Sequence, residues 1–163
     1  FKKVFNFLNS NESIENLSLS LTISFIFSLI PLNPIIHPLL IIILIICNGN
    51  LLIFLFVTPF LSIITPISYE ELHIIGNSIL TIENAQEIYN KLSKLPILTF
   101  TNWNNTISLG AYFVSVIIFI PLFYIYSFFI KMYRNSILKS IENSKFLKIY
   151  KKLNWLSVLG RGK

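Results

Sequence analysis

Two long stretches of the sequence contain no Lys, Arg, Asp or Glu, and this feature constrains the fold more than any other. They are residues 16–69 and 95–130, and His37 is the only histidine within them. With 54% hydrophobic and 12% charged residues, a chain of 163 residues has too much apolar surface for a water-soluble domain. The sequence therefore predicts a membrane protein whose charge-free stretches are the embedded parts.

The apolar parts of the chain predict an all-α, polytopic membrane fold. Four apolar runs stand out, at residues 17–32, 35–47, 51–66 and 106–130. Only the last run has the roughly 20 residues that a helix needs to cross about 30 Å of hydrocarbon. The predicted order is a proline-broken helical hairpin, a further short span, an external amphipathic helical segment, one long span and a basic amphipathic C-terminal helix.

These features divide the chain into a cytoplasmic N-terminal segment, a membrane module with the broken hairpin, an external amphipathic helical segment, a transmembrane helix and a cytoplasmic basic tail. Their residues are 1–16, 17–66, 67–104, 105–131 and 132–163. From Lys131 onward the chain has nine Lys and Arg against the single Glu142, whereas the external segment has a small acidic excess. Because basic flanks stay in the cytoplasm, both termini are predicted to be cytoplasmic in a multi-pass membrane protein.

The sequence SLIPLNPIIHP interrupts the first apolar region with three prolines. Each proline lacks an amide hydrogen and crowds the preceding turn, so the region cannot be one straight helix. We expect a hairpin broken at residues 31–38, either re-entrant or built from two tilted short spans. Backbone groups freed by the break need protein or water as partners, so two roles are open for the polar side chains: satisfying the break, or lining a substrate or proton path. The candidate residues of this helix break or path are Pro31, Asn33 and His37.

Local signals predict how the third apolar run begins and ends. The sequence CNGNLL predicts a tight turn in which Gly49 takes a positive φ. Pro59 and Pro66 predict a kink and then the end of the run. Ser68 and Glu71 predict a capping box at the start of the external helix.

Small residues recur at helical spacing in two places. The first set lies at intervals of four on one predicted helical face, and the second set lies in the long span. Small side chains allow another backbone to approach closely, and in lipid such packing replaces the missing hydrophobic driving force. The alternative for the serines is a hydrogen bond back to their own helix. The predicted helix-packing residues are Ser20, Ser24, Ser28, Gly110, Ala111 and Ser115.

The tail sequence KFLKIYKKLNWLSVL predicts a basic amphipathic helix that lies in the lipid headgroup plane. Anionic headgroups attract Lys and Arg there, and tryptophan suits the interface. Membrane lipids are therefore predicted partners, whereas nucleic acid is not, because the basic segment is tethered beside lipid. The predicted lipid-surface residues are Lys145, Lys148, Lys151, Lys152 and Trp155.

The sequence contains few parts from which a catalytic centre could be built. It has no Asp, two histidines and the single cysteine Cys47, and it lacks a Gly-rich phosphate loop and a serine nucleophile elbow. No catalytic residue, cofactor or metal is therefore predicted, and the chain is not expected to be an enzyme. Glu70 and His73, three residues apart, are a weak candidate for half of a metal site.

The chain resembles small bacterial inner-membrane proteins related to domain of unknown function 2062. The resemblance rests on a helix that ends at Pro31, the histidine that follows it, the sequence TNWNNTISLG and the basic tail. The likeness spans nearly the whole chain, although this chain has serines where relatives tend to carry glycines in the first helix. The resemblance implies a membrane component of an envelope assembly that handles lipid, with a larger envelope protein as its partner. The family-like motif residues are Asn104, Asn105 and Thr106.

Together with what the resemblance implies, these features predict an anchor or partner subunit of a bacterial envelope assembly in the inner membrane, with no catalysis of its own. Its predicted partner is a larger envelope protein or a second copy of the chain. The alternative is a small oligomeric transporter or channel with its path at the helix break near Asn33 and His37.

Overall fold

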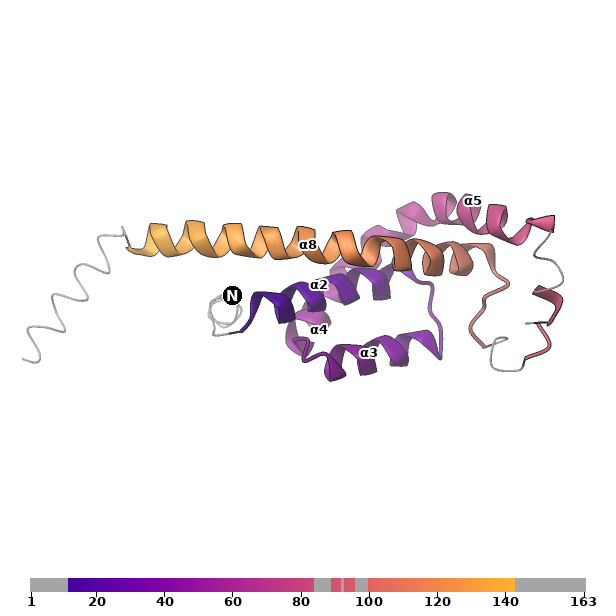
Figure 1. Cartoon of the computed structure of the whole chain (residues 1–163), viewed down its shortest axis with the longest axis horizontal. Coiled ribbons are helices and arrows are strands. Elements are labelled where there is room, and N and C mark those ends of the chain that lie inside the picture. The colour runs from indigo at the N-terminus through magenta and orange to yellow at the C-terminus, as the bar shows by residue number, and fades with distance from the viewer. Residues whose placement is uncertain (1–11, 84–88, 92, 96–99, 143–163) are drawn as a thin grey trace, which may run out of the picture.

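The structure is a computed structural model, and every regular element in its described part is a helix (Figure 1). The prediction of an all-helical fold is therefore confirmed for that part of the chain. The structure describes residues 12–83, 89–91, 93–95 and 100–142, with side chains as far as residue 136. In chain order the helices are α2 (Ile14–Leu29), α3 (Ile36–Ile46), α4 (Leu51–Ile64), the 3₁₀ helix η1 (Thr65–Ser68), α5 (Tyr69–Leu80) and α8 (Thr106–Glu142).

α2 lies at the centre of the bundle, because α3, α4 and α8 all pack against it. Nine of its sixteen residues are buried, whereas α3 buries two residues and α4 buries one. Ser13 caps the start of the helix, since its Oγ accepts a hydrogen bond from the Asn16 N–H at 3.1 Å. α2 therefore begins three residues before the predicted apolar run, and it ends at Leu29, ahead of Pro31.

α8 runs antiparallel to α2. Near the start of α2, the Ser127 hydroxyl donates to Ser18 Oγ at 2.9 Å, and Arg134 Nη2 donates to the Glu12 carbonyl at 2.8 Å. Near its end, α2 shares a hydrophobic cluster with Ala111, which lies in the first turns of α8. The start of α2 and the distal half of α8 therefore lie toward the same end of the bundle (Figure 1).

α4, η1 and α5 follow one another directly and form a second helical run long enough to cross a membrane. This run, Leu51–Leu80, has 30 residues, and the apolar part of α8, Thr106–Ser136, has 31. The expectation that only residues 106–130 are long enough is therefore wrong. α4 does end near Pro66, at Ile64, but Pro66 lies in the first turn of η1, where a missing N–H costs little. The chain therefore continues as helix past the proline.

α5 and the first turns of α8 cross at very close range through two glycines. A Cβ atom on Gly76 would collide with the Thr106 carbonyl oxygen, and a Cβ atom on Gly110 would collide with the Leu72 carbonyl oxygen. Both obstacles are backbone atoms, which cannot move aside as a flexible side chain can. Glycine at both positions therefore allows the two helix backbones to touch.

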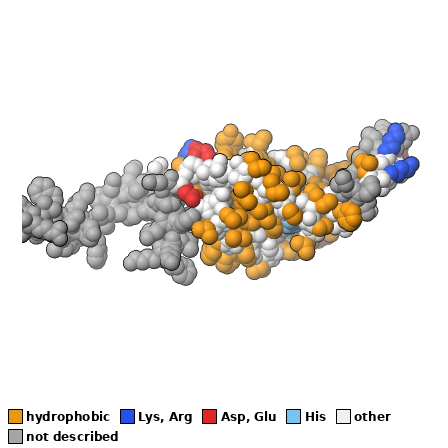
Figure 2. Space-filling model, turned by 90° about the horizontal axis from the view of Figure 1, so that it is seen from below, with side chains coloured by type: hydrophobic (Ala, Val, Ile, Leu, Met, Phe, Trp, Pro, Cys, Tyr) orange, Lys and Arg blue, Asp and Glu red, His pale blue; other side chains and the backbone are white. Residues whose placement is uncertain are grey.

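The outer surface of the bundle is apolar, whereas much of its interior is polar. Ile63 on α4 is 77% exposed and Val116 on α8 is 76% exposed. Figure 2 shows hydrophobic side chains across the middle of one face and charged side chains toward its two ends. In the interior, α2 alone buries five Ser and Thr side chains. This distribution is the reverse of the one that a water-soluble protein adopts.

Two local predictions are wrong. In the turn between α3 and α4 the positive φ belongs to Asn48, at 56°, and not to Gly49. Asparagine tolerates this left-handed conformation because its short polar side chain can hydrogen-bond locally. The capping box of Ser68 and Glu71 does not form, since α5 continues directly from η1 and the Ser68 side chain makes no capping hydrogen bond.

Replacing Gly110 with alanine is expected to lower the free energy of unfolding by about 1–3 kcal/mol, because the added methyl group overpacks a backbone contact. Thermal unfolding of the purified protein in lipid nanodiscs measures this change. Gly49→Ala is the matched control, since a Cβ there first meets the flexible end of the Leu44 side chain. Equal losses for the two variants would contradict the close crossing of α5 and α8.

Candidate functional site

The proline break between α2 and α3 is the candidate site, and Asn33 organises it. The Asn33 Oδ1 accepts hydrogen bonds from the backbone N–H groups of Ile35 and Ile36, both at 2.9 Å. Its Nδ2 donates to the Phe100 carbonyl at 3.2 Å, which connects the break to the segment before α8. Asn33 is only 1% exposed. One buried side chain therefore satisfies backbone groups of two separate segments.

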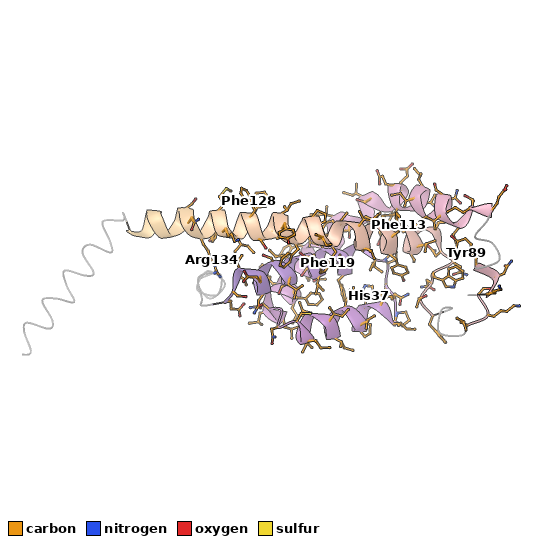
Figure 3. All side chains as sticks on the ribbon, viewed as in Figure 1. His37, Tyr89, Phe113, Phe119, Phe128 and Arg134 are labelled. Atoms are coloured by element: carbon orange, nitrogen blue, oxygen red, sulfur yellow. The ribbon has the colours of Figure 1, made fainter. Side chains whose placement is uncertain are left out.

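His37 closes the break from the α3 side. Its Nδ1 lies 3.1 Å from the Asn33 nitrogen, and the neutral acceptor tautomer accepts the hydrogen bond of that N–H. The ring packs edge-on against Phe27 of α2 at a centroid distance of 4.1 Å, and Phe27 packs against Phe54 of α4 at 5.1 Å. Figure 3 shows His37 between α2 and α3. The imidazole is thus enclosed by the hairpin rather than presented on its surface.

Pro31 acts on the site through the backbone. The residue before it, Ile30, has an extended conformation with φ −78° and ψ 126°, as a residue that precedes proline prefers. This conformation turns the chain away from α2 and toward the site. The structure therefore brings Asn33 and His37 together and places Pro31 beside them in the chain.

A row of hydroxyl groups, here called the hydroxyl seam, joins α2 to α4 and η1. The three predicted serines of α2 each donate to the carbonyl four residues earlier, at 2.7 to 2.8 Å. Ser28 also contacts the neighbouring helices, since Thr65 Oγ1 donates to the Ser28 carbonyl at 2.7 Å and Ser62 Oγ lies 3.3 Å from Ser28 Oγ. The hydrogen bond back to the same helix therefore occurs at all three serines, and close packing through their small side chains stays a prediction. Ser28 Oγ also lies 3.2 Å from the Thr58 carbonyl, and the hydroxyl seam consists of Ser20, Ser24, Ser28, Ser62 and Thr65.

The small residues of α8 meet two different neighbours. Gly110 lies at the crossing with α5, and Ala111 is fully buried in the cluster that contains Ile26 and Leu29 of α2. Ser115 is 5% exposed. Within the described residues, its Oγ and the Oγ1 of Thr58 are buried and have no hydrogen-bond partner. These two oxygens are unusual, because buried side-chain polar atoms are mostly paired.

The family-like motif lies where α8 begins. The Asn105 Oδ1 accepts from the Ile107 N–H at 2.9 Å, which satisfies a free donor of the first turn. Thr106 Oγ1 lies 2.6 Å from His73 Nδ1 of α5, whereas Asn104 is exposed. Asn105 and Thr106 therefore start the helix and link it to α5.

Few of the described groups could perform acid–base or metal chemistry. The described ranges contain no group of three or more His, Cys, Asp and Glu side chains that could hold a metal ion, and the Glu70–His73 pair gains no third ligand there. The contacts of His37 in this part of the chain are with backbone groups and an aromatic ring. These contacts suit a histidine that stabilises the proline break. The predicted lipid-surface residues lie outside the described residues: Lys145, Lys148, Lys151, Lys152 and Trp155.

Comparisons of the chain with protein-family models, with curated proteins and with solved structures find no significant match. The resemblance to relatives of domain of unknown function 2062 therefore gains no support from them and stays a prediction. Function has to be argued from the geometry of the chain itself.

Three residues that connect the helices carry only weak signals in the sequence. Asn50 donates its N–H to Ser20 Oγ and its Nδ2 hydrogen to Glu12 Oε2, although the sequence marks it only as part of a turn. Thr65 is one polar residue at the end of an apolar run, and Gly76 is a single glycine inside a helical pattern. Each of the three contacts a partner that is distant in the sequence, and a local sequence pattern does not reveal such a contact.

Replacing Asn33 with alanine is expected to lower the free energy of unfolding by about 1–3 kcal/mol, because buried backbone groups lose their partner. Asn104→Ala, at an exposed asparagine, is the matched control and should change it by less than about 0.5 kcal/mol. Denaturant unfolding of both variants in the same detergent, followed by tryptophan fluorescence, measures the difference. A loss for Asn33→Ala no larger than that of the control would show that Asn33 does not organise the break.

Proposed function

We propose that this chain is a multi-pass protein of the bacterial inner membrane that serves as an anchor or partner subunit of an envelope assembly, without catalysis of its own. The observation that carries the proposal is the distribution of side chains. Exposed side chains on α4 and α8 are large and apolar, whereas hydroxyl groups between α2 and η1 bond to backbone carbonyls. Lipid favours such an exterior, and inside lipid the protein itself must satisfy its polar groups.

The lengths of the helices support this placement. At 1.5 Å per residue, Leu51–Leu80 extends about 45 Å and Thr106–Ser136 about 46 Å, against about 30 Å of hydrocarbon. α2 and α3 are shorter, at about 24 Å and 16 Å. In this proposal they form a hairpin that enters the bilayer from the side where Glu12 and Arg134 lie. The basic residues from Lys131 onward assign that side to the cytoplasm.

The geometry of the break supports a structural role rather than a transport role. Asn33 and His37 bond to backbone groups, and Phe27 covers the imidazole ring. Their hydrogen-bonding groups are therefore used within the protein, which favours the structural role.

The proposed partner surface is α5, which lies outside the membrane in this topology. Its exposed face carries Glu70 and Glu71 near the apolar Ile74, which is 60% exposed. A mixed polar and apolar surface of this kind suits a protein partner. The larger envelope protein that the resemblance implies is the partner that we propose for it.

A small oligomeric transporter or channel is the second candidate, and one observation favours it. The unpartnered oxygens of Thr58 and Ser115 lie inside the bundle, where water or an ion could supply the missing contacts. In that case transport would depend on the hydroxyl seam or on His37. The next experiment separates the two candidates.

A cysteine at Ser78 on the exposed face of α5, in a Cys47→Ser background, should cross-link to a larger envelope protein in intact cells of the source bacterium. Mass spectrometry identifies the product. Val116→Cys is the matched control, because this exposed position of α8 faces lipid in the proposal and should give no protein product.

Proteoliposomes of the purified protein provide the opposing measurement. We expect no solute or proton flux that depends on His37. Flux that His37→Ala abolishes while the protein stays folded, with no cross-link from Ser78, would replace the subunit proposal by the transporter.

A further inference from the structure

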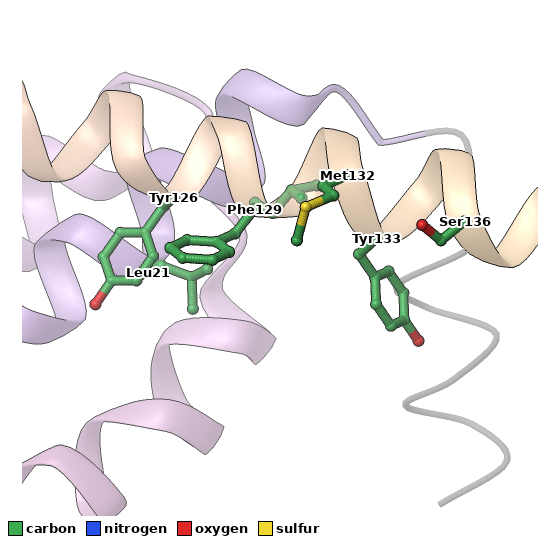
Figure 4. A pocket seen from close by; sticks show the side chains of 7 residues that line it. Leu21, Tyr126, Phe129, Met132, Tyr133 and Ser136 are labelled. Atoms are coloured by element: carbon green, nitrogen blue, oxygen red, sulfur yellow. The ribbon is translucent and has the colours of Figure 1, made fainter.

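A groove lies at the distal part of α8, far from the proline break. Its volume is about 510 Å³, and it forms between one side of α8 and the central helix α2. Figure 4 shows side chains of α8 projecting into it from one side of the helix. The lining residues are Leu21, Tyr126, Phe129, Ile130, Met132, Tyr133 and Ser136.

The groove is lined almost entirely by apolar surface. Leu21, Phe129, Ile130 and Met132 contribute hydrocarbon, an aromatic ring and a thioether, and Tyr126 places a hydroxyl group at the inner end of the groove. Its outer part contains Tyr133 and Ser136, whose hydroxyl groups can hydrogen-bond. Tyrosine favours membrane interfaces, where one end of the side chain is apolar and the other is wet. The groove therefore offers an apolar surface along which an acyl chain can lie, with hydroxyl groups at both ends.

A cation, Arg134, lies next to the outer part of the groove but is not one of its lining residues. Arg134 follows Tyr133 directly and lies one helical turn beyond Ile130, so it stands beside two lining residues. Figure 3 shows Arg134 projecting from α8 toward the start of α2, where Nη2 donates to the Glu12 carbonyl. This bond holds the guanidinium in place and leaves other N–H donors for an anion. The guanidinium therefore places a positive charge near this end of the groove, where the carboxylates of Glu12 and Glu15 lie at the start of α2.

The dimensions agree with one leaflet of a bilayer. Along α8, Tyr126 lies about 12 Å deeper than Arg134, and half of the hydrocarbon thickness is about 15 Å. An apolar chain that enters from the Arg134 level therefore reaches the depth of Tyr126 within its own leaflet. On the cytoplasmic side, that leaflet is the one with anionic lipids.

We propose that this groove binds an anionic phospholipid, with one acyl chain along Leu21, Phe129 and Ile130 and the phosphate on Arg134. The inference rests on the proposed function, because it requires α8 to cross the bilayer. It goes beyond that proposal by naming a lipid class and a site for it. A second copy of the chain or its own C-terminal residues are the competing occupants.

The test is native mass spectrometry of the full-length protein released from nanodiscs that contain equal amounts of phosphatidylglycerol and phosphatidylcholine. Phosphatidylglycerol should be retained about five-fold over phosphatidylcholine, the preference that one cation near an anionic headgroup gives. Arg134→Gln should remove the preference and Arg134→Lys should keep part of it. Leu21→Trp, which fills the groove, should lower retention of both lipids, whereas Phe128→Trp, at an exposed neighbour outside the groove, should leave retention unchanged.

A photoreactive group attached to the Tyr133→Cys variant, in a Cys47→Ser background, distinguishes the three possible occupants of the groove. A lipid adduct supports the proposal, and an adduct with a second copy or with the C-terminal residues overturns it. Retention without preference, or an unchanged preference in Arg134→Gln, also overturns it.

Extraction of membranes with alkaline carbonate distinguishes failure of the lipid-site proposal from failure of the proposed function. A protein that stays in the membrane without lipid preference refutes only the lipid site. A protein that carbonate removes refutes the membrane placement as well.

Discussion

The contact of α2 with the helices around it is the interaction on which the rest of the structure depends. An apolar exterior provides no hydrophobic driving force between helices in lipid, so association has to come from close packing and internal hydrogen bonds. α2 supplies both, because its serines are small, Ser28 Oγ donates to the Thr58 carbonyl of α4, and the Ser28 carbonyl accepts from Thr65 Oγ1 of η1. Ser18 extends the same chemistry to Ser127 of α8. One short helix thus organises three longer or more exposed ones.

Different contacts hold the helices together at the two ends of the bundle. At one end, Asn33 and His37 satisfy the backbone that the prolines free, and the Gly76–Gly110 crossing draws α5 onto α8. At the other end, Asn50 and Arg134 both bond to Glu12, which connects the start of α2 to two neighbouring helices. The groove lined by Leu21 and the distal part of α8 lies at that second end. A structural site and a proposed ligand site therefore occupy opposite ends of one bundle.

Much of the fold could be predicted because its causes are local. Stretches without charge predict the helical runs, and prolines predict the break with Asn33 and His37 as its polar partners. Features that depend on distant partners could not be predicted. Pro66 marks a helix end by local rules, yet α5 continues past it to pack on α8. The partners of the serines and of Gly110 follow from the packing of the whole bundle, which no short pattern contains.

The central claim is that the exposed apolar side chains face lipid while α2 is enclosed. Photolabelling the unmodified protein in liposomes with a lipid-soluble carbene precursor, followed by mass spectrometry of its peptides, tests this claim most directly. The account predicts labelling at Ile63 and Val116, which are 77% and 76% exposed, and none at Leu17 and Ile23, which are each 1% exposed. Labelling of Leu17 and Ile23 at the level of Val116 would contradict it.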